Sequence, residues 1–276
     1  MRSVIRRWLF LLSLPTAPVF AQEPTYTNRI GMAFVLIKPG RMTVGKFQPT
    51  DPPPPTSRRP LGNDSGLLWT ATDYRRAKEM AEWDARPGFP VRIARPYYLG
   101  KFEVTQAQWK QVMDSNPSVF GGDKVTDADQ HPVEQVTWED VQTFLKKLNA
   151  MDKGRRYRLP TEFEWEYAAR AGAEDDVSWE DIRAAAQLDA RTTSRVGGKT
   201  PNAWGLYDTL GNVWEWTQDY YNEKPFADPI PPRSGREHVL KGASFVGDVK
   251  NATYLTHAAG PGNGWDVGFR VAMEVE

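Results

Sequence analysis

The sequence contains no cysteine among its 276 residues. The chain therefore forms no disulfide bond and offers no thiolate to a soft metal ion such as copper. Histidine is also scarce, with three residues, His131, His238 and His257. This limits the side chains that can transfer protons near neutral pH. A chain of this size without disulfides must be stabilised by its core, its many aromatic side chains and any ion that it binds.

An excess of charge of one sign is missing as well. Lysine plus arginine number 35, and aspartate plus glutamate also number 35. This balance gives no reason to expect nucleic acid or a charged membrane surface as a partner. Nucleotide-binding and hydrolase motifs are absent too, including the P-loop, the dinucleotide fingerprint, GxSxG and HExxH. The carboxylates are too scattered to indicate a glycosidase pair.

Long apolar segments are missing, and the first short one is informative. Arg2, Arg6 and Arg7 precede an apolar run from Trp8 to Leu14, which is too short to span a bilayer. Small residues then lead to Ala21, a pattern typical of a secretory signal peptide. We expect residues 1–21 to be removed on export. The mature protein would then be slightly acidic, soluble and, in a Gram-negative host, periplasmic.

Residues 202–219, NAWGLYDTLGNVWEWTQD, fit neither a helical nor an alternating apolar pattern. Asp208 and Glu215 flank a Gly-Asn turn, so their carboxylates and the carbonyls between them could converge on one point. Calcium prefers such a mixed set of oxygen ligands. A turn whose acids face water is the equally open alternative.

This segment resembles the motif GLYDxxGNVWEW of the formylglycine-generating enzyme (sulfatase-modifying factor) family. Other blocks resemble the family in the same order. They are GMAFVLI at 31–37, YYLGKFEVTQAQW at 97–109, HPVEQVTW at 131–138, YRLPTEFEWEYAARAG at 157–172, and KGASF at 241–245 followed by GFR at 268–270. The resemblance implies an α+β fold distantly similar to C-type lectins, with short strands, two or three helices and much irregular chain. We expect one domain over 22–276, with a Pro-rich insertion around 47–90.

The resemblance also implies a structural calcium ion. Its ligands would be the side chains of Asp208 and Glu215 and the carbonyl groups of Gly211 and Val213. The family's other calcium site, usually an Asn-rich loop, finds no convincing ligand set between residues 178 and 198.

The copper site of the family is lost. Formylglycine-generating enzymes hold copper with two cysteines shortly after the KGGS-type block, and these positions fall on Gly247 and Ala252. We therefore expect no copper, and the mechanism of the parent enzymes is excluded.

The remaining candidates for catalysis near this region are His257, Asp248 and Ser244. A histidine beside carboxylates can act as a proton shuttle, and a hydrogen-bonded structural histidine is the alternative. His131 is expected to be structural, and His238, in a Pro/Gly/Arg loop, to be solvated.

Three residues are candidates for binding a substrate, Trp265, Tyr254 and Arg270. Trp265 could be a stacking platform or part of the core. Arg270 could form a buried ion pair, which we favour, or bind an anionic group.

Local signals predict several elements. Residues 97–102 are expected to form a strand, and residues 72–85 a helix within the insertion. Three further helices are expected to begin after the N-cap residues Thr105, Thr137 and Thr161, with the first and last at 106–113 and 162–171.

Two functions remain. Exported, cysteine-free relatives in pseudomonads are implicated in maturation of the siderophore pyoverdine, by oxidation of its dihydro chromophore precursor. The resemblance to them makes such tailoring, with dioxygen as electron acceptor, our first hypothesis. The alternative is a non-enzymatic periplasmic partner in signalling, as in the phosphorylation pathway of type VI secretion. Carbohydrate binding rests only on the lectin analogy.

Overall fold

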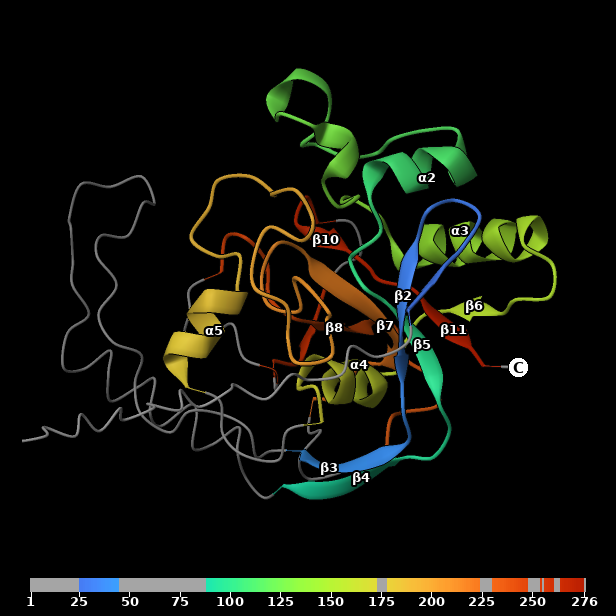
Figure 1. Ribbon diagram of the computed structural model, residues 1–276, viewed down its shortest axis with the longest axis vertical. Coiled ribbons are helices and arrows are strands. Elements are labelled where there is room, and N and C mark those ends of the chain that lie inside the picture. Colours follow the sequence, from blue (N-terminus) through green and yellow to red (C-terminus); the bar gives the residue numbers. More distant parts are fainter. Residues whose placement is uncertain are drawn as a thin grey trace, which may run out of the picture.

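The computed structural model describes residues 25–44, 88–172, 178–223, 230–247, 254, 256–260 and 264–275 (Figure 1). The expected signal peptide, the expected helix at 72–85 and nearly all of the Pro-rich insertion lie outside these residues, as does Asp248. Within the described part of the chain, the helices are too short or too polar to cross a membrane.

A five-stranded antiparallel sheet joins both ends of the described chain. Its strand order is β1-β2-β5-β11-β6. The strands are β1 (Thr25–Thr27), β2 (Ala33–Ile37), β5 (Tyr97–Gly100), β11 (Ala272–Glu274) and β6 (Tyr157–Arg158). The strand predicted at 97–102 is confirmed and ends at Gly100, two residues early.

This sheet is covered on both faces. Phe34 and Met273 belong to the cluster of buried side chains that includes α2 and α3, whereas their neighbours Val35 and Ala272 belong to a second cluster with α4 and the β3-β4 pair. The alternation follows from the two-residue period of a strand. In the first cluster, the Trp109 ring stacks on Phe144 at 5.3 Å between ring centroids.

A second sheet has the order β10-β7-β8-β9. It consists of β10 (Val267–Gly268), β7 (Trp214–Tyr220), β8 (His238–Lys241) and β9 (Ala258–Ala259). The short β10 runs parallel to β7, and the other pairs are antiparallel. A separate antiparallel pair, β3 (Gly40–Val44) and β4 (Phe89–Ile93), brackets the Pro-rich insertion. Because Val44 pairs with Phe89, the insertion leaves and rejoins the fold at one point.

The described helices begin where the capping residues predict. They are α2 (Gln106–Met113), α3 (Trp138–Met151), α4 (Glu162–Ala169) and α5 (Trp179–Ala185), with short 3-10 turns η1 (Gly122–Lys124) and η2 (Ala128–Gln130). Thr105, Thr137 and Thr161 each form a complete capping box with the third helical residue. The last predicted helix ends at Ala169 rather than 171, because Ala171 takes a positive φ of 51°. Helix α5, capped by Ser178, was not predicted.

Candidate functional site

The turn that follows β8, at Gly247, leaves no space for a cysteine side chain. Gly247 donates its N–H to the Ser244 carbonyl at 2.8 Å, which closes a tight turn. A Cβ added at Gly247 would lie 2.9 Å from that same carbonyl oxygen. The position predicted for the family's first cysteine therefore has no room for a side chain in this conformation. The second, Ala252, lies outside the described residues.

Three aromatic side chains meet beside this turn, and we call Phe120, Phe245 and Trp265 the aromatic platform. Their ring centroids lie 5.2 to 5.9 Å apart in tilted or edge-to-face contacts. Phe245 is fully buried, whereas Trp265 is 46% exposed. Such contacts hold aromatic rings in fixed orientations. The platform thus presents one half-exposed indole on a rigid base.

Hydrogen bonds to Asp266 hold the segment that carries Trp265 of the platform. The Ser244 hydroxyl donates to Asp266 Oδ2 at 2.7 Å, and Trp214 donates its N–H to the Asp266 carbonyl at 2.8 Å. Ser244 is only 1% exposed. Its partner is a carboxylate next to Trp265, so Ser244 positions the platform and is not paired with a histidine as an activated nucleophile would be.

A buried carboxylate holds the Phe120 loop. Glu134 accepts the N–H groups of Val119 at 3.0 Å and Phe120 at 2.9 Å, and its side chain is inaccessible. Burial raises the pKa of the Glu134 carboxyl, against the effect of these hydrogen bonds. The loop and the carboxylate therefore depend on each other for their position.

His257 lies in a different environment. Its Nδ1 is 2.6 Å from Glu162 Oε1, its Nε2 is 2.8 Å from the Asn222 carbonyl oxygen, and its ring stacks on Tyr221. A carbonyl only accepts hydrogen bonds, so Nε2 donates to Asn222, and Nδ1 is held by the Glu162 carboxyl group. Both nitrogens are thus engaged by protein groups. This is the arrangement of the structural alternative, and neither nitrogen is available to a substrate while these contacts last.

Glu162 and His257 are part of a larger buried group, which we call the α4 charge cluster: Glu162, Glu166, Arg170, Lys241 and His257. The Lys241 ammonium lies 3.2 Å from Glu166 and 3.8 Å from Glu162, and Arg170 contacts Glu166 at 3.1 Å. Burial by itself raises the pKa of Glu162, but His257 and Lys241 outweigh it and the pKa is lowered. Lys241, Arg170 and His257 thus face two carboxylates.

Arg270 is at the centre of the other buried group. It is fully buried and contacts both oxygens of Glu215, through Nε at 2.6 Å and Nη2 at 2.5 Å. It also donates to the carbonyls of Gly100 and Tyr207. This geometry is the buried ion pair, the favoured of the two alternatives for Arg270.

Three carboxylates surround this single guanidinium. Glu103, Asp208 and Glu215 are all at most 3% exposed, and with Arg270 we call them the Arg270 charge cluster. Burial, then Asp208 and Glu215, raise the pKa of Glu103, and burial raises the pKa of Asp208 to about 6. Glu103 also accepts the N–H of Val213 at 3.1 Å. No local pattern singled out Glu103, because its partners lie more than a hundred residues away.

Two of the four residues expected to bind calcium, Asp208 and Glu215, lie in this cluster. A surplus of buried carboxylates suits a hard cation. However, Glu215 already accepts hydrogen bonds from Arg270 and from Trp165 Nε1 at 2.7 Å. Among the residues described, acidic and histidine side chains nowhere gather in the groups of three that could hold a metal. Calcium here would thus depend on the Gly211 and Val213 carbonyls, as the resemblance implies.

The other candidate residues have structural surroundings. Tyr254 is 5% exposed within a core cluster with Trp165, and burial raises its pKa to about 12. His131 is buried and bonded to Thr193, as expected of a structural residue. The expectation that His238 is solvated was wrong. It is 8% exposed, because β8 carries its ring between the aromatic rings of residues 138 and 220.

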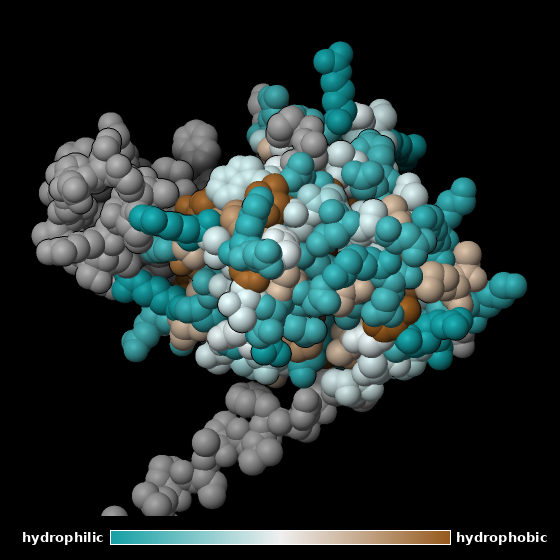
Figure 2. Space-filling view, turned by 90° about the horizontal axis from the view of Figure 1, so that it is seen from above, coloured by the Kyte–Doolittle hydropathy of each residue, from teal (hydrophilic) through white to brown (hydrophobic). Residues whose placement is uncertain are grey.

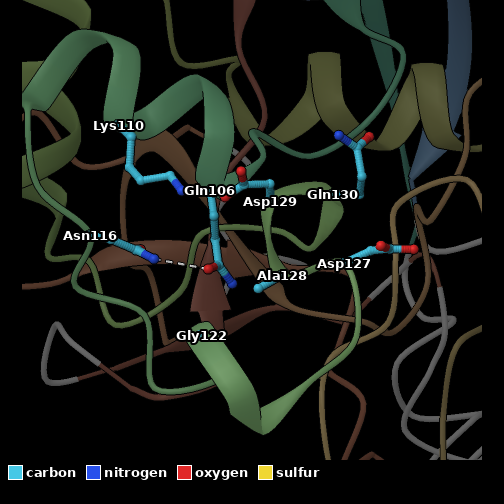
Figure 3. Close-up of a pocket in the computed structure, with 8 residues that line it drawn as sticks. All are labelled: Gln106, Lys110, Asn116, Gly122, Asp127, Ala128, Asp129 and Gln130. Atoms are coloured by element: carbon cyan, nitrogen blue, oxygen red, sulfur yellow. Dashed lines mark hydrogen bonds and ion pairs between the residues drawn. The ribbon is translucent and has the colours of Figure 1, made fainter.

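A polar pocket lies beyond the Phe120 loop, between α2 and the η1–η2 segment, with a volume of about 390 Å³. Figure 2 looks down on the molecule from the top of Figure 1, and this face is mainly hydrophilic. No sequence pattern indicates this pocket, because its residues come from an ordinary helix face and two irregular turns (Figure 3).

Residues 21–275 match the family description "sulfatase-modifying factor enzyme 1-like domain". The chain belongs to this family. The match extends over all of the fold described above, including both charge clusters and the platform. The α+β fold expected for the sulfatase-modifying factor family is thereby confirmed.

Curated relatives of this family member carry different names. The "Chaperone protein LppX" of Paenibacillus barcinonensis is 30% identical over 233 residues, covering 63% of this chain and 79% of that protein. The "Formylglycine-generating enzyme" of Streptomyces coelicolor is 34% identical over 146 residues, 44% of each chain. The alignment thus spans less than half the length of that enzyme.

Among solved structures, PvdO from Pseudomonas aeruginosa superposes with a TM-score of 0.65 over 92% of this chain and 99% of that chain. The identity is 20%. This similarity establishes a common fold.

Proposed function

We propose that the protein is a periplasmic tailoring protein of siderophore maturation that binds a flat dihydroxyaromatic precursor. The aromatic platform carries this proposal, since it presents Trp265, 46% exposed, beside the turn at Gly247 where the family's enzymes place a catalytic thiol. The dihydro chromophore precursor of pyoverdine is a ligand of this class. Siderophore chemistry is chosen from the resemblance to exported, cysteine-free relatives, and the chain shares its fold with PvdO.

The proposed reaction is a two-electron oxidation of the bound ring. Two hydrogens leave the dihydro ring as two protons and two electrons, a new ring double bond forms, and dioxygen is reduced to hydrogen peroxide. Dihydroxyaromatic compounds are easily oxidised, so binding and orientation provide much of the catalysis. Because His257 is occupied by two acceptors, Asp248, outside the described residues, remains the candidate base.

We also propose that a structural calcium ion binds to Asp208, Gly211, Val213 and Glu215. The support is electrostatic. Three buried carboxylates face the single positive charge of Arg270, so a cation would offset the remaining repulsion.

A non-enzymatic role as a periplasmic binding partner is the second candidate. It is favoured by the same contacts that remove two residues from catalysis, namely the double hydrogen bonding of His257 and the burial of Ser244. The similarity to a protein named as a chaperone is in line with it. The platform would then contact a protein partner.

Genetics and binding together test the first proposal. Deletion of the gene in its source bacterium should stop the mature fluorescent siderophore and cause a reduced precursor to accumulate. Complementation with Trp265→Ala should fail, whereas Ile230→Ala, which removes another exposed apolar side chain (74% exposed), should restore production. In vitro, dihydroxyquinoline should quench the tryptophan fluorescence of the wild type and much less that of Trp265→Ala. Unchanged siderophore production would refute the tailoring function, and a pull-down of a partner that depends on Trp265 would support the second candidate.

A further inference from the structure

The strand pair β3-β4 and the residues that flank it carry a cluster of positive charge. We call this cluster the basic ribbon: Lys38, Arg41, Arg92 and Arg95. All four residues are exposed. The segments 38–44 and 88–96 contain these four basic residues and no acidic residue. The balance of charge over the whole chain therefore conceals a local excess.

Two of these arginines face each other across the strand pair. Arg41 pairs directly with Arg92 in the register of β3 and β4. Side chains at such positions lie on the same face with their Cβ atoms about 5 Å apart, where like charges repel. In the described part of the chain, the arginines that form ion pairs are others, so neither of these two has an acidic partner. The pair is therefore destabilising in the free protein, and a bound anion would remove the repulsion.

The acidic residues of the helix next to the ribbon are already engaged. Helix α4 packs against β4. Its Glu164 accepts hydrogen bonds from both terminal nitrogens of Arg158, at 2.6 and 2.8 Å. Its other two acids, Glu162 and Glu166, are buried in the α4 charge cluster. These carboxylates are thus not available to neutralise the basic ribbon.

The layout of the basic ribbon favours an extended anionic surface. Arg92 and Arg95 are three residues apart, so the positive charges spread over about 10 Å of extended chain. Because all four residues are exposed, they do not enclose a single small ion. Each guanidinium offers several N–H groups in a planar fork, which suits phosphate oxygens. An array of phosphate groups, as in the headgroups of a lipid bilayer, matches both the charge and its spread.

The opposite end of the molecule carries the opposite charge. Residues 110–130, which include the end of α2 and both 3-10 turns, contain four aspartates and two lysines. Helix α2 and the pair β3-β4 lie at opposite ends of the long axis in Figure 1. A protein with this charge distribution is oriented by the field of an anionic surface, with its basic end toward that surface.

We propose that the basic ribbon docks the protein on an anionic phospholipid surface, as an electrostatic contact without insertion. The large apolar side chains that are exposed in the described structure, at positions 151, 230, 265 and 275, do not belong to the ribbon. Each basic side chain close to an anionic bilayer strengthens binding by about five- to sixfold. The α2 end of the docked molecule faces away from the bilayer. This docking is independent of the function proposed above.

Co-sedimentation with vesicles tests the proposal on the whole exported protein. Vesicles that mix phosphatidylcholine with phosphatidylglycerol provide the anionic surface, and phosphatidylcholine alone gives the baseline. With residues 1–21 removed, the chain is slightly acidic, so its net charge opposes binding to anionic lipid. Preferential sedimentation with the anionic vesicles therefore requires a local basic surface. Binding should weaken as salt is raised to physiological ionic strength, where charges are screened beyond about 8 Å.

Matched variants locate the contact. Arg41→Gln combined with Arg92→Gln should weaken binding to anionic vesicles by about thirtyfold, the product of two such side chains. Neither side chain has a hydrogen bond or ion pair in the described structure, so this variant should remain folded. Lys146→Gln combined with Lys147→Gln removes the same charge from exposed positions on α3, which covers the opposite face of the five-stranded sheet. This control should keep binding within about twofold of the wild type, because distant charges are screened.

Three results would overturn the proposal. Equal sedimentation of the wild type with anionic and neutral vesicles would show that anionic lipid is not bound. Equal losses in the two double variants would show that net charge, and not the basic ribbon, is responsible. Full competition by inorganic phosphate at the concentration of lipid phosphate would assign the ribbon to a free anion, and equally tight, ribbon-dependent binding of polyglutamate would assign it to an acidic protein. None of these results bears on the aromatic platform.

Discussion

The two buried charge clusters differ in their balance. In the α4 charge cluster, Lys241, Arg170 and His257 face two glutamates, and the carboxyl of Asp219 lies nearby, where it accepts the Glu162 N–H at 2.6 Å. In the Arg270 charge cluster, one guanidinium faces three carboxylates. Both are almost inaccessible to water, so the difference cannot be attributed to solvent.

This difference in charge indicates which cluster would be stabilised by a bound cation. In the α4 charge cluster each glutamate has basic partners, and both His257 nitrogens are already bonded, which explains why His257 is unsuited to proton transfer. A group with surplus negative charge either keeps protons on its carboxylates or takes up a cation. The Arg270 charge cluster is therefore where an ion should matter, and the α4 charge cluster is where it should not.

The largest effect is expected from breaking the Arg270 ion pair. Glu215→Gln removes the carboxylate that bonds the buried guanidinium directly and should lower the free energy of unfolding by about 3–5 kcal/mol. Urea unfolding measures this, with the exposed Glu139→Gln as control, expected to change stability by at most about 0.5 kcal/mol. Equal losses in the two variants would show that the pair contributes nothing special.

The second prediction is that calcium stabilises the protein through the Arg270 charge cluster and not through the α4 charge cluster. If it binds the Arg270 charge cluster, adding it to chelator-treated protein should raise stability by about 2.7 kcal/mol at a hundredfold excess over Kd. Thermal unfolding with and without calcium measures this. Asp208→Asn should reduce the response, whereas Glu162→Gln in the α4 charge cluster should keep it. An equal response to magnesium, or none, would argue against the calcium site.

Breaking the α4 charge cluster should cost less. His257→Phe keeps an aromatic ring against Tyr221 but leaves Glu162 and the Asn222 carbonyl without a donor, so it should cost about 1–3 kcal/mol. Chemical denaturation gives the stability. The same variant should still bind dihydroxyquinoline. Loss of turnover without loss of stability would instead restore a catalytic role for His257.

The smallest effect is on pH dependence. Burial, opposed by its bond to the Glu162 N–H, raises the pKa of Asp219 to about 6. An acid whose pKa is higher when folded binds its proton more tightly in the folded state, so stability should fall as pH rises from about 4 to about 6. Asp219→Asn should flatten this fall by about 1 kcal/mol, a modest figure because the side chain is partly exposed. Unfolding at several pH values in both proteins measures it, and parallel curves would contradict the assignment.

The predictable parts of the molecule were those set by nearby residues. Each of the three threonine caps is paired with a residue only three positions later, which a sequence pattern shows directly. Helices α2, α3 and α4 therefore begin where expected. The strand at 97–102 was predicted in the same way, and the family blocks implied the α+β fold.

The site could be predicted only in part, because its contacts join distant segments. Trp265 was a candidate platform, with a place in the core as the alternative, but Phe120 comes from a loop some 145 residues earlier. Glu162 and His257 are 95 residues apart, and no local pattern shows that both histidine nitrogens are engaged. Burial of His238 likewise depends on rings from α3 and β7.

The turn at Gly247 has an evolutionary consequence. A glycine codon can become a cysteine codon by one nucleotide change, so loss of a copper thiol by such a step would seem easily reversed. Here the reverse substitution would place its Cβ 2.9 Å from the Ser244 carbonyl oxygen. The backbone must move before a thiol can be tolerated, and until it moves the return mutation only destabilises the protein. Restoring a thiol at this position would therefore require a backbone shift in addition to the codon change.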